Sequence, residues 1–308
     1  MHPAPSLVVF TVLSGLGLGM IAWIGLGLGS ESPLFGWIGG FIALAVTGLG
    51  GIASVGHLGQ PKNAWRAFSQ WRSSWLSREA CLMVTAKVAL ALYLGLWLIF
   101  DLRIQPLGWV AAALAGATIY ATSMIYAQLR TVPSWSATPT PHLFIAMAMS
   151  GGLMAVSAIM GMVGLEMPIL FILVWLVGAA GTAIWWQTQA AGAPRGFHGS
   201  SMETATGLSG LGRVSLLEPP HTGSNYLLKE MAFEVGRARA YQLRKLGAVL
   251  GFLVPIVLAL GAWALVSTGA AGLVLALAVI CHVAGVMALR WLFFAEAQHV
   301  QALYYGQR

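Results

Sequence analysis

Long apolar runs recur along the whole chain and constrain its fold more than any other feature of the sequence. Hydrophobic residues make up 58% of the 308 residues, and charged residues make up only 8%. A helix needs about 20 apolar residues to cross the hydrocarbon core of a bilayer. The sequence therefore predicts an all-α membrane protein with eight transmembrane helices, at about 6–29, 33–57, 79–100, 106–128, 141–163, 168–190, 245–267 and 270–297.

The connections divide the eight predicted helices into two similar halves. Each group of four helices has a basic loop after its second helix, at 58–78 in the first group and at 191–244 in the second. This similarity favours two four-helix bundles within one membrane-anchor domain over residues 1–308. The loop 191–244, between the sixth and seventh helices, is longer than a connection requires. Its charges, prolines and aromatic residues favour an ordered docking surface, with partial disorder as the alternative.

The basic residues divide unevenly between the two sides of the predicted helices. Of the 16 Lys and Arg residues, Arg103 alone falls on one side, while Lys87 and Arg290 fall inside helices. Loops rich in Lys and Arg stay in the cytoplasm. We therefore expect a multi-pass protein of a bacterial inner membrane with both termini in the cytoplasm. The remaining basic residues share the side of the termini: Lys62, Arg66, Arg72, Arg78, Arg130, Arg195, Arg213, Lys229, Arg237, Arg239, Arg244, Lys245 and Arg308.

Several kinds of chemistry are excluded by motifs that the sequence lacks. Cys81 and Cys281 stand alone inside predicted helices, so neither an iron–sulfur cluster nor another metal site is expected in this chain. There is no glycine-rich phosphate-binding loop and no nucleophile elbow. Any reaction of a polar substrate is therefore expected in another subunit. Basic residues placed at a membrane surface do not indicate nucleic-acid binding.

The densest group of polar residues lies where the second and third predicted helices reach the basic side. The segment HLGQPKNAWRAF covers 57–68, WLSREA covers 75–80, and TVPSW follows at 131–135. These segments resemble the membrane anchor subunits of the dimethyl sulfoxide reductase type, the DmsC family within the NrfD-like superfamily. The resemblance extends over all eight predicted helices in order.

The resemblance implies a function in electron transfer. Such anchors bind a molybdopterin catalytic subunit and an iron–sulfur subunit on one face, and they exchange electrons with a membrane quinone. In the family the motif at His57 lies on the docking face, which is the basic face here, so the partners are expected in the cytoplasm. The segment 218–231 resembles a loop in the anchors of cytoplasmic sulfite-oxidising complexes. The leading hypothesis is therefore the anchor of a sulfite dehydrogenase that passes electrons to ubiquinone or menaquinone.

Two other classes of function stay open. The same anchor can run in reverse, as the quinol-oxidising subunit of a dimethyl sulfoxide or polysulfide reductase, because the direction of electron flow is set by the partner. A transporter without a redox role is the third hypothesis. It is the weakest, because a transporter concentrates polar residues and broken helices at the bilayer midplane, whereas this chain places its polar residues mainly at one face.

His57 and Glu79 are the predicted catalytic residues. A neutral imidazole can hydrogen-bond a quinone carbonyl and pass a proton near neutral pH, and Glu79 can deliver protons. The helix dipole offers a simpler explanation for both residues. His57 ends the second predicted helix, and Glu79 follows a Ser77 cap in the first turn of the third. Both explanations stay open.

The predicted quinone site contains His57, Gly59, Trp65, Arg66 and Arg290. Trp65 can cover the quinone head group or meet the iron–sulfur subunit. Arg66 can stabilise charge on the reduced quinone, although topology and docking also account for it. Arg290, inside the eighth helix, is expected either to form a wall of the site or to enter a structural ion pair.

A haem b is the remaining cofactor hypothesis. His142 and His282 could ligate it if they face each other across a bundle. The family to which the chain is similar usually works without haem. Pro141, at the start of the fifth helix, also makes His142 resemble an ordinary interfacial residue.

Overall fold

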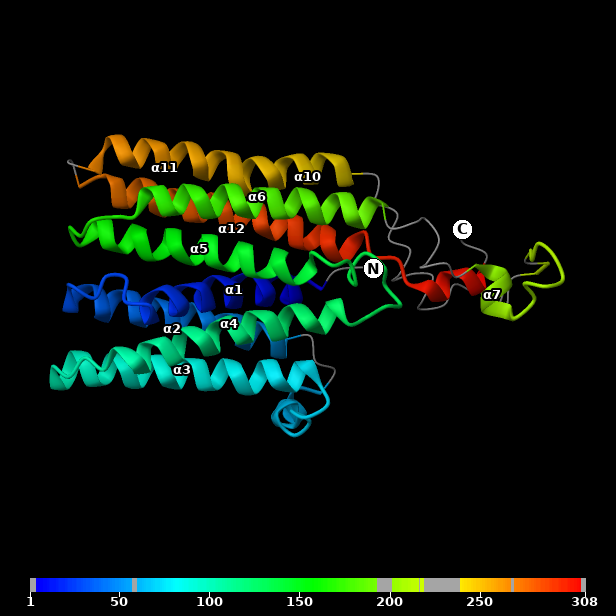
Figure 1. The fold of residues 1–308 in the computed structure, drawn as a ribbon, viewed down its shortest axis with the longest axis horizontal. Coiled ribbons are helices and arrows are strands. Elements are labelled where there is room, and N and C mark those ends of the chain that lie inside the picture. The colour runs from blue at the N-terminus through cyan, green and yellow to red at the C-terminus, as the bar shows by residue number, and fades with distance from the viewer. Residues whose placement is uncertain are drawn as a thin grey trace.

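The protein is a bundle of long helices that run side by side (Figure 1). The computed structural model describes residues 4–56, 60–192, 201–215, 217–218, 239–266 and 269–305. Eight helices in these ranges are long and apolar enough to cross a membrane, which confirms the predicted all-α fold. They are α1 (Pro5–Gly25), α2 (Pro33–Val55), α3 (Trp75–Phe100), α4 (Gln105–Ala127), α5 (Thr140–Met162), α6 (Ile169–Gly192), the continuous helix Ala240–Ala264 and α12 (Ala271–Ala295). The continuous helix consists of α10 (Ala240–Ala248), the π-helical turn η3 (Val249–Leu253) and α11 (Val254–Ala264).

Two helices begin four or five residues earlier than the apolar runs predict, at residues 75 and 240 instead of 79 and 245. In α3 the reason is Arg78, whose charge hides the first turn from a hydropathy reading. Its guanidinium reaches back to the helix end, donates to the carbonyls of Trp71 and Arg72 at 3.1 and 2.7 Å, and covers the ring of Trp75. A long basic side chain can therefore lie in the first turn of a membrane helix with its charge at the interface.

Within the described residues, three short helices lie outside the eight long ones. The 3-10 helix η1 (Pro61–Phe68) connects α2 to α3. The helix α7 (Met202–Thr206) lies in the predicted loop 191–244, and its Met202 packs against Leu303 of η5 (Val300–Tyr305). Most of that loop, and with it most of the predicted docking surface, lies outside the described residues.

The helix α1 lies at the centre of the assembly, where it contacts α2, α4, α5 and α12. On one side of it α2, α3 and α4 pack together, and on the other side α5, α6, α11 and α12 do so, as Figure 1 shows. The two groups meet where α1 and α4 touch α5. Residues far apart in sequence are thereby brought to the shared boundary between the groups.

The two ends of the bundle differ in charge. The start of α1, the helices η1 and α7, and η5 lie at one end (Figure 1). At the opposite end, the Arg103 guanidinium donates to the carbonyl of Ser30 at 3.0 Å. Apart from Arg103 and the intrahelical Lys87 and Arg290, the Lys and Arg residues within the described ranges belong to the first end, which we call the basic end.

Glycine allows α1 and α5 to approach backbone to backbone. A Cβ atom added at Gly152 would lie 2.6 Å from the Cα atom of Gly19, and one added at Gly19 would overlap the carbonyl of Ala148. Small residues at such crossings permit the close van der Waals packing that holds membrane helices together. The boundary between the two helix groups therefore depends on glycine at these positions.

We expect Gly152→Ala to destabilise the bundle by about 1–3 kcal/mol, because the added methyl group has to push α1 and α5 apart. Thermal unfolding of the detergent-solubilised protein should show a lower Tm. Gly178→Ala is the matched control, since a Cβ atom at Gly178 meets nothing within 4 Å. An equal Tm for the two variants would contradict the role assigned to this crossing.

Candidate functional site

A cavity of about 590 Å³ lies at the basic end, among α1, α2, η1, α3 and α4. We call it the outer cavity. Most of its wall is apolar, with Phe10, Ile52 and Met83 among the lining residues. Its volume falls within the roughly 300–1,000 Å³ of small-molecule sites, which are typically apolar with a few well-placed polar groups.

The outer cavity opens toward the lipid between α2 and α3. Ile52 on α2 and Val84 on α3 line it, and 70% and 45% of their surfaces are exposed, so these helices do not close the cavity on this side. Gly48 and Gly51 supply a wall of α2 without side chains. An apolar molecule dissolved in the bilayer therefore has a lateral entrance to the cavity.

Glu79 is the buried carboxylate of the outer cavity. It lines the cavity with only 2% of its surface exposed, and it accepts a hydrogen bond from the hydroxyl of Thr122 on α4. The predicted Ser77 cap is wrong, because the N-cap of α3 is Ser74. Glu79 thus lies beyond the first turn, where stabilisation by the helix dipole has faded. Its burial beside a cavity calls for an explanation other than helix capping.

The hydroxyl of Thr122 faces two acceptors. Besides Glu79, it lies 3.0 Å from the backbone carbonyl of Thr118. A hydroxyl has one proton to donate, so both contacts are satisfied together only when the carboxyl of Glu79 carries a proton of its own. The arrangement is therefore suited to hold a proton at Glu79 and to respond when that proton leaves.

The wall also contains polar residues that the sequence does not assign to the site, among them Lys87 and Tyr126. Lys87 lines the cavity two turns along α3 from Glu79, and Tyr126 lines it from α4 with 6% of its surface exposed. The spacing of Glu79 and Lys87 places them on nearly the same helix face, and this spacing was the signal for Lys87. Nothing in the sequence distinguished Tyr126 from other interfacial tyrosines.

The helix η1 covers the cavity at the basic end. Trp65 lines it while 65% exposed, and Arg66 lies outside the wall, with its guanidinium carbon 5.7 Å from the Trp65 ring centroid. The predicted residues His57 and Gly59 lie outside the described residues. Val55 and Trp65, on either side of them in sequence, both line the outer cavity.

Arg290 is not brought into the outer cavity. It is 3% exposed in the interior of the bundle, with its guanidinium carbon 3.6 Å from the Phe144 ring centroid. Phe144 in turn stacks on Tyr126 at a centroid distance of 5.6 Å. Aromatic rings therefore connect Arg290 to the wall of the outer cavity. No ion pair of Arg290 exists within the described residues, which leaves the predicted structural pair without support.

The two histidines of the haem hypothesis lie at different depths. His142, in the first turn of α5, is exposed and lies 5.5 Å from the Trp185 ring. His282 is buried and faces Gly151, nine residues further along α5. At 1.5 Å per residue this is a displacement of roughly 13 Å. The structure does not bring the pair together around one ligand.

The motif TVPSW anchors α12 at the basic end. The indole nitrogen of Trp135 donates to the carbonyl of Phe293 at 2.8 Å, and the two rings stack 5.7 Å apart. The carbonyl of Thr131 accepts from the backbone nitrogen of Val300 at 2.9 Å. This motif therefore positions the last helix and the segment that follows it.

Comparison with known proteins agrees with this architecture. Residues 1–197, more than half of the chain, match the family model described as the DMSO reductase anchor subunit (DmsC). The chain is also 31% identical to a sulfite dehydrogenase subunit of Allochromatium vinosum, over 99% of each chain. Together these matches show that the protein belongs to the DmsC family of membrane anchor subunits of oxidoreductase complexes.

Proposed function

We propose that this chain is the quinone-reducing anchor of a molybdenum and iron–sulfur sulfite dehydrogenase in the bacterial inner membrane. The observation that carries the proposal is the outer cavity, which opens to lipid and encloses the buried carboxyl of Glu79. An apolar wall suits an isoprenoid quinone, and a few polar groups suit its two carbonyl oxygens. Membership of the anchor family supports the assignment.

Reduction of a quinone takes up two electrons and two protons. In the proposal the electrons come from an iron–sulfur subunit docked at the basic end, and Glu79 donates a proton from its carboxyl oxygen. His57, just beyond the described end of α2, hydrogen-bonds the second carbonyl and supplies the other proton. Gly59 lies beside His57 in sequence and belongs to the same proposed site.

The other polar residues hold the head group in place. Trp65 and Phe68 of η1 cover the cavity at the end where electrons arrive. Lys87 lies in the wall, and Arg66 lies over Trp65 just outside it. In the proposal both supply positive charge that stabilises the reduced form of the quinone. Arg290 packs on Phe144, which stacks on Tyr126, and it makes no direct contact with the quinone in this proposal. No haem is assigned to His142 and His282.

The partners dock at the basic end, which we place in the cytoplasm together with both termini. The concentration of Lys and Arg there supports this orientation. The relative from Allochromatium vinosum, named as part of a sulfite dehydrogenase, supports sulfite as the electron source, with the molybdopterin subunit as its site of oxidation. We also propose that α1–α4 and α5–α12 form two four-helix bundles, in line with their contacts.

A second candidate is a quinol-oxidising anchor of a dimethyl sulfoxide or polysulfide reductase. The family description names the DMSO reductase anchor subunit. A quinol oxidised in the same cavity would then release a proton to Glu79, whereas a quinone reduced there takes a proton from it. Sulfite-dependent quinone reduction by the purified complex separates the two candidates.

Glu79→Gln is expected to lower sulfite-dependent quinone reduction by about 10²–10⁴-fold, the usual contribution of a general acid. Gly51→Phe, which places a ring in the outer cavity, should weaken quinone binding instead. Glu166→Gln, at the opposite end, and Gly95→Phe, where a Cβ atom meets open space, are the matched controls. Quinone titrations of the whole complex measure both effects. Wild-type kinetics in both test variants would refute the cavity as the quinone site.

His57→Ala is expected to abolish quinone turnover while complex assembly and sulfite oxidation with an artificial dye stay intact. The reason is that the imidazole acts only on the quinone. Activity with dye and with quinone is compared on the same preparation. Unchanged quinone turnover would remove His57 from the site.

The proposed orientation predicts the outcome of reporter fusions. Alkaline phosphatase fused after Arg308 should be inactive, because the C-terminus stays in the cytoplasm, whereas a fusion in the 101–104 turn should be active. Fluorescent protein fusions at the same positions should give the opposite pattern. An active phosphatase after Arg308 would place the docking face outside the cell and favour an exported reductase.

A further inference from the structure

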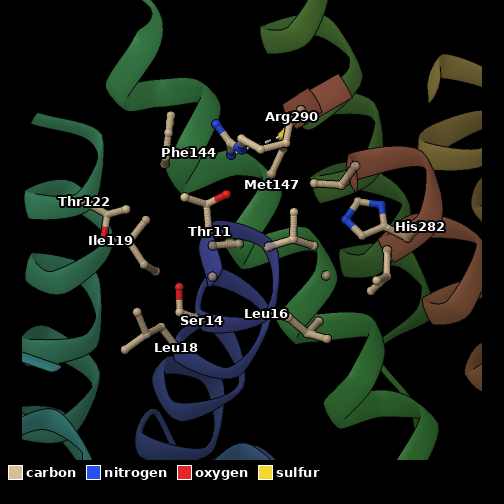
Figure 2. Close-up of a pocket in the computed structure, with 16 residues that line it drawn as sticks. Thr11, Ser14, Leu16, Leu18, Ile119, Thr122, Phe144, Met147, His282 and Arg290 are labelled. Atoms are coloured by element: carbon tan, nitrogen blue, oxygen red, sulfur yellow. Dashed lines mark hydrogen bonds between the residues drawn. The ribbon is translucent and has the colours of Figure 1, made fainter. Parts of the chain in front are cut away.

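A second cavity lies deep in the bundle, among α1, α4, α5 and α12, and Figure 2 shows the residues around it. We call it the inner cavity. Its volume of about 20 Å³ is sufficient for one water molecule. Thr11, Ser14, Thr122, His282 and Arg290 give it polar walls.

Buried nitrogen atoms without partners belong to the wall of the inner cavity. Nε and Nη1 of Arg290 make no hydrogen bond to any described residue. Nε2 of His282 has no partner of good hydrogen-bond geometry there, although the backbone of Met147 lies close to the imidazole ring. Both side chains are at least 97% buried, with 3% and 2% of their surfaces exposed. An unpaired charge at this depth is costly, and polar cavities of this size normally hold water that satisfies such groups. The inner cavity is therefore a site for bound water.

A proline in the continuous helix determines how His282 faces this water. Pro255 has no N–H with which to bond the carbonyl of Gly251, four residues earlier. Nδ1 of His282 lies 2.6 Å from that carbonyl. A carbonyl only accepts, so Nδ1 carries the hydrogen in the neutral ring and Nε2 keeps its lone pair. The contact with Gly251 thus fixes the ring of His282 in the wall of the inner cavity.

Toward the basic end, Arg290 also lines a third cavity, which we call the side cavity. Its volume of about 20 Å³ again has room for one water molecule. Glu296 and Arg244 line its far wall, 2.6 Å apart and 28% and 37% exposed. The side cavity therefore lies between Arg290 and an ion pair that reaches the surface.

The inner cavity is connected to the outer cavity through the side chain of Thr122. Thr122 lines the inner cavity, and its hydroxyl donates to Glu79, which lines the outer cavity. Figure 2 shows Thr122 across the inner cavity from His282, with Ser14 and Thr11 of α1 between them. Polar groups and water-sized spaces thus follow one another from Glu296 to Glu79.

We propose that these elements form a water-filled proton path that returns a proton to Glu79 from the basic end. The path runs from the Arg244–Glu296 pair through the side cavity, past Arg290 into the inner cavity, and through Thr122. The proposal rests on the proposed function, because Glu79 needs a new proton only if it has given one to quinone. Thr122 accepts a proton from cavity water and passes its own to Glu79, so that the hydroxyl is restored.

Arg290 is a positioning residue in this path. Its charge orients water oxygens toward the guanidinium and opposes an excess proton while Glu79 is neutral. Once Glu79 has lost its proton, its negative charge offsets that of Arg290, and a proton can arrive. The other ionisable groups around the path are Lys87 on α3 and Tyr126 on α4, which line the outer cavity with Glu79, and His282 on α12, with no carboxylate from α1 or α5. The path is thereby coupled to the turnover of the quinone.

The test is quinone reduction by the intact complex carrying Arg290→Met. We expect kcat at saturating quinone to fall about ten-fold or more while the KM for quinone and the dye-linked activity stay unchanged. The deficit should grow as the pH rises, because proton donors become scarce. Azide, whose small conjugate acid carries protons into blocked paths, should restore much of the rate. Arg103→Met, at the opposite end, is the control and should behave like wild type.

An unchanged kcat in Arg290→Met, or a loss that azide does not relieve, would overturn the path. If this variant does not assemble, Glu296→Gln at the surface serves in its place, with the same rescue expected and the same refutation. Failure of the proposed function looks different, since wild-type complex would then neither bind nor reduce quinone and Glu79→Gln would have no effect.

Discussion

Within a bilayer every polar group must find its partner inside the protein or in enclosed water, and this constraint organises the structure. Several hydroxyl groups bond a carbonyl of their own helix, as Ser14 does with the carbonyl of Phe10 at 2.6 Å and Thr47 with that of Ala43 at 2.7 Å. Glu79, His282 and Arg290 cannot do so, because each has more hydrogen-bonding capacity than its own helix can meet. These three side chains lie around the central helix α1, where both groups of helices contribute residues.

Close packing and open space alternate along this boundary for a physical reason. Where Gly19 of α1 meets Gly152 of α5, the backbones touch and leave no room for side chains. The same two helices also line the inner cavity, where Gly15, Ala148 and Gly151 lie beside Thr11 and Arg290. Backbone contact and water-sized space thus lie next to each other at the boundary between the two groups of helices.

The sequence predicted the number and order of the helices because hydropathy depends only on composition along the chain. It also singled out Glu79 and Trp65, since their motif is contiguous at one loop. It assigned Arg290 either to the wall of the quinone site or to a structural ion pair, whereas the structure places its guanidinium against the ring of Phe144, which stacks on Tyr126. The rotation of a helix about its axis decides that difference, and an evenly apolar helix such as α12 gives no amphipathic pattern from which to read it. The contact between His282 and Gly251 was equally hidden, because it depends on how two helices meet.

The lateral entrance between α2 and α3 has a consequence for what the protein can distinguish. A head group that enters from the bilayer can leave its isoprenoid tail among the lipids, outside the wall formed by Ile52 and Val84. For the proposed quinone site, tail length then contributes little to recognition, and the concentration that governs occupancy is the mole fraction of quinone in the membrane. The anchor would accordingly serve hosts that make short or long tails without any change in its helices.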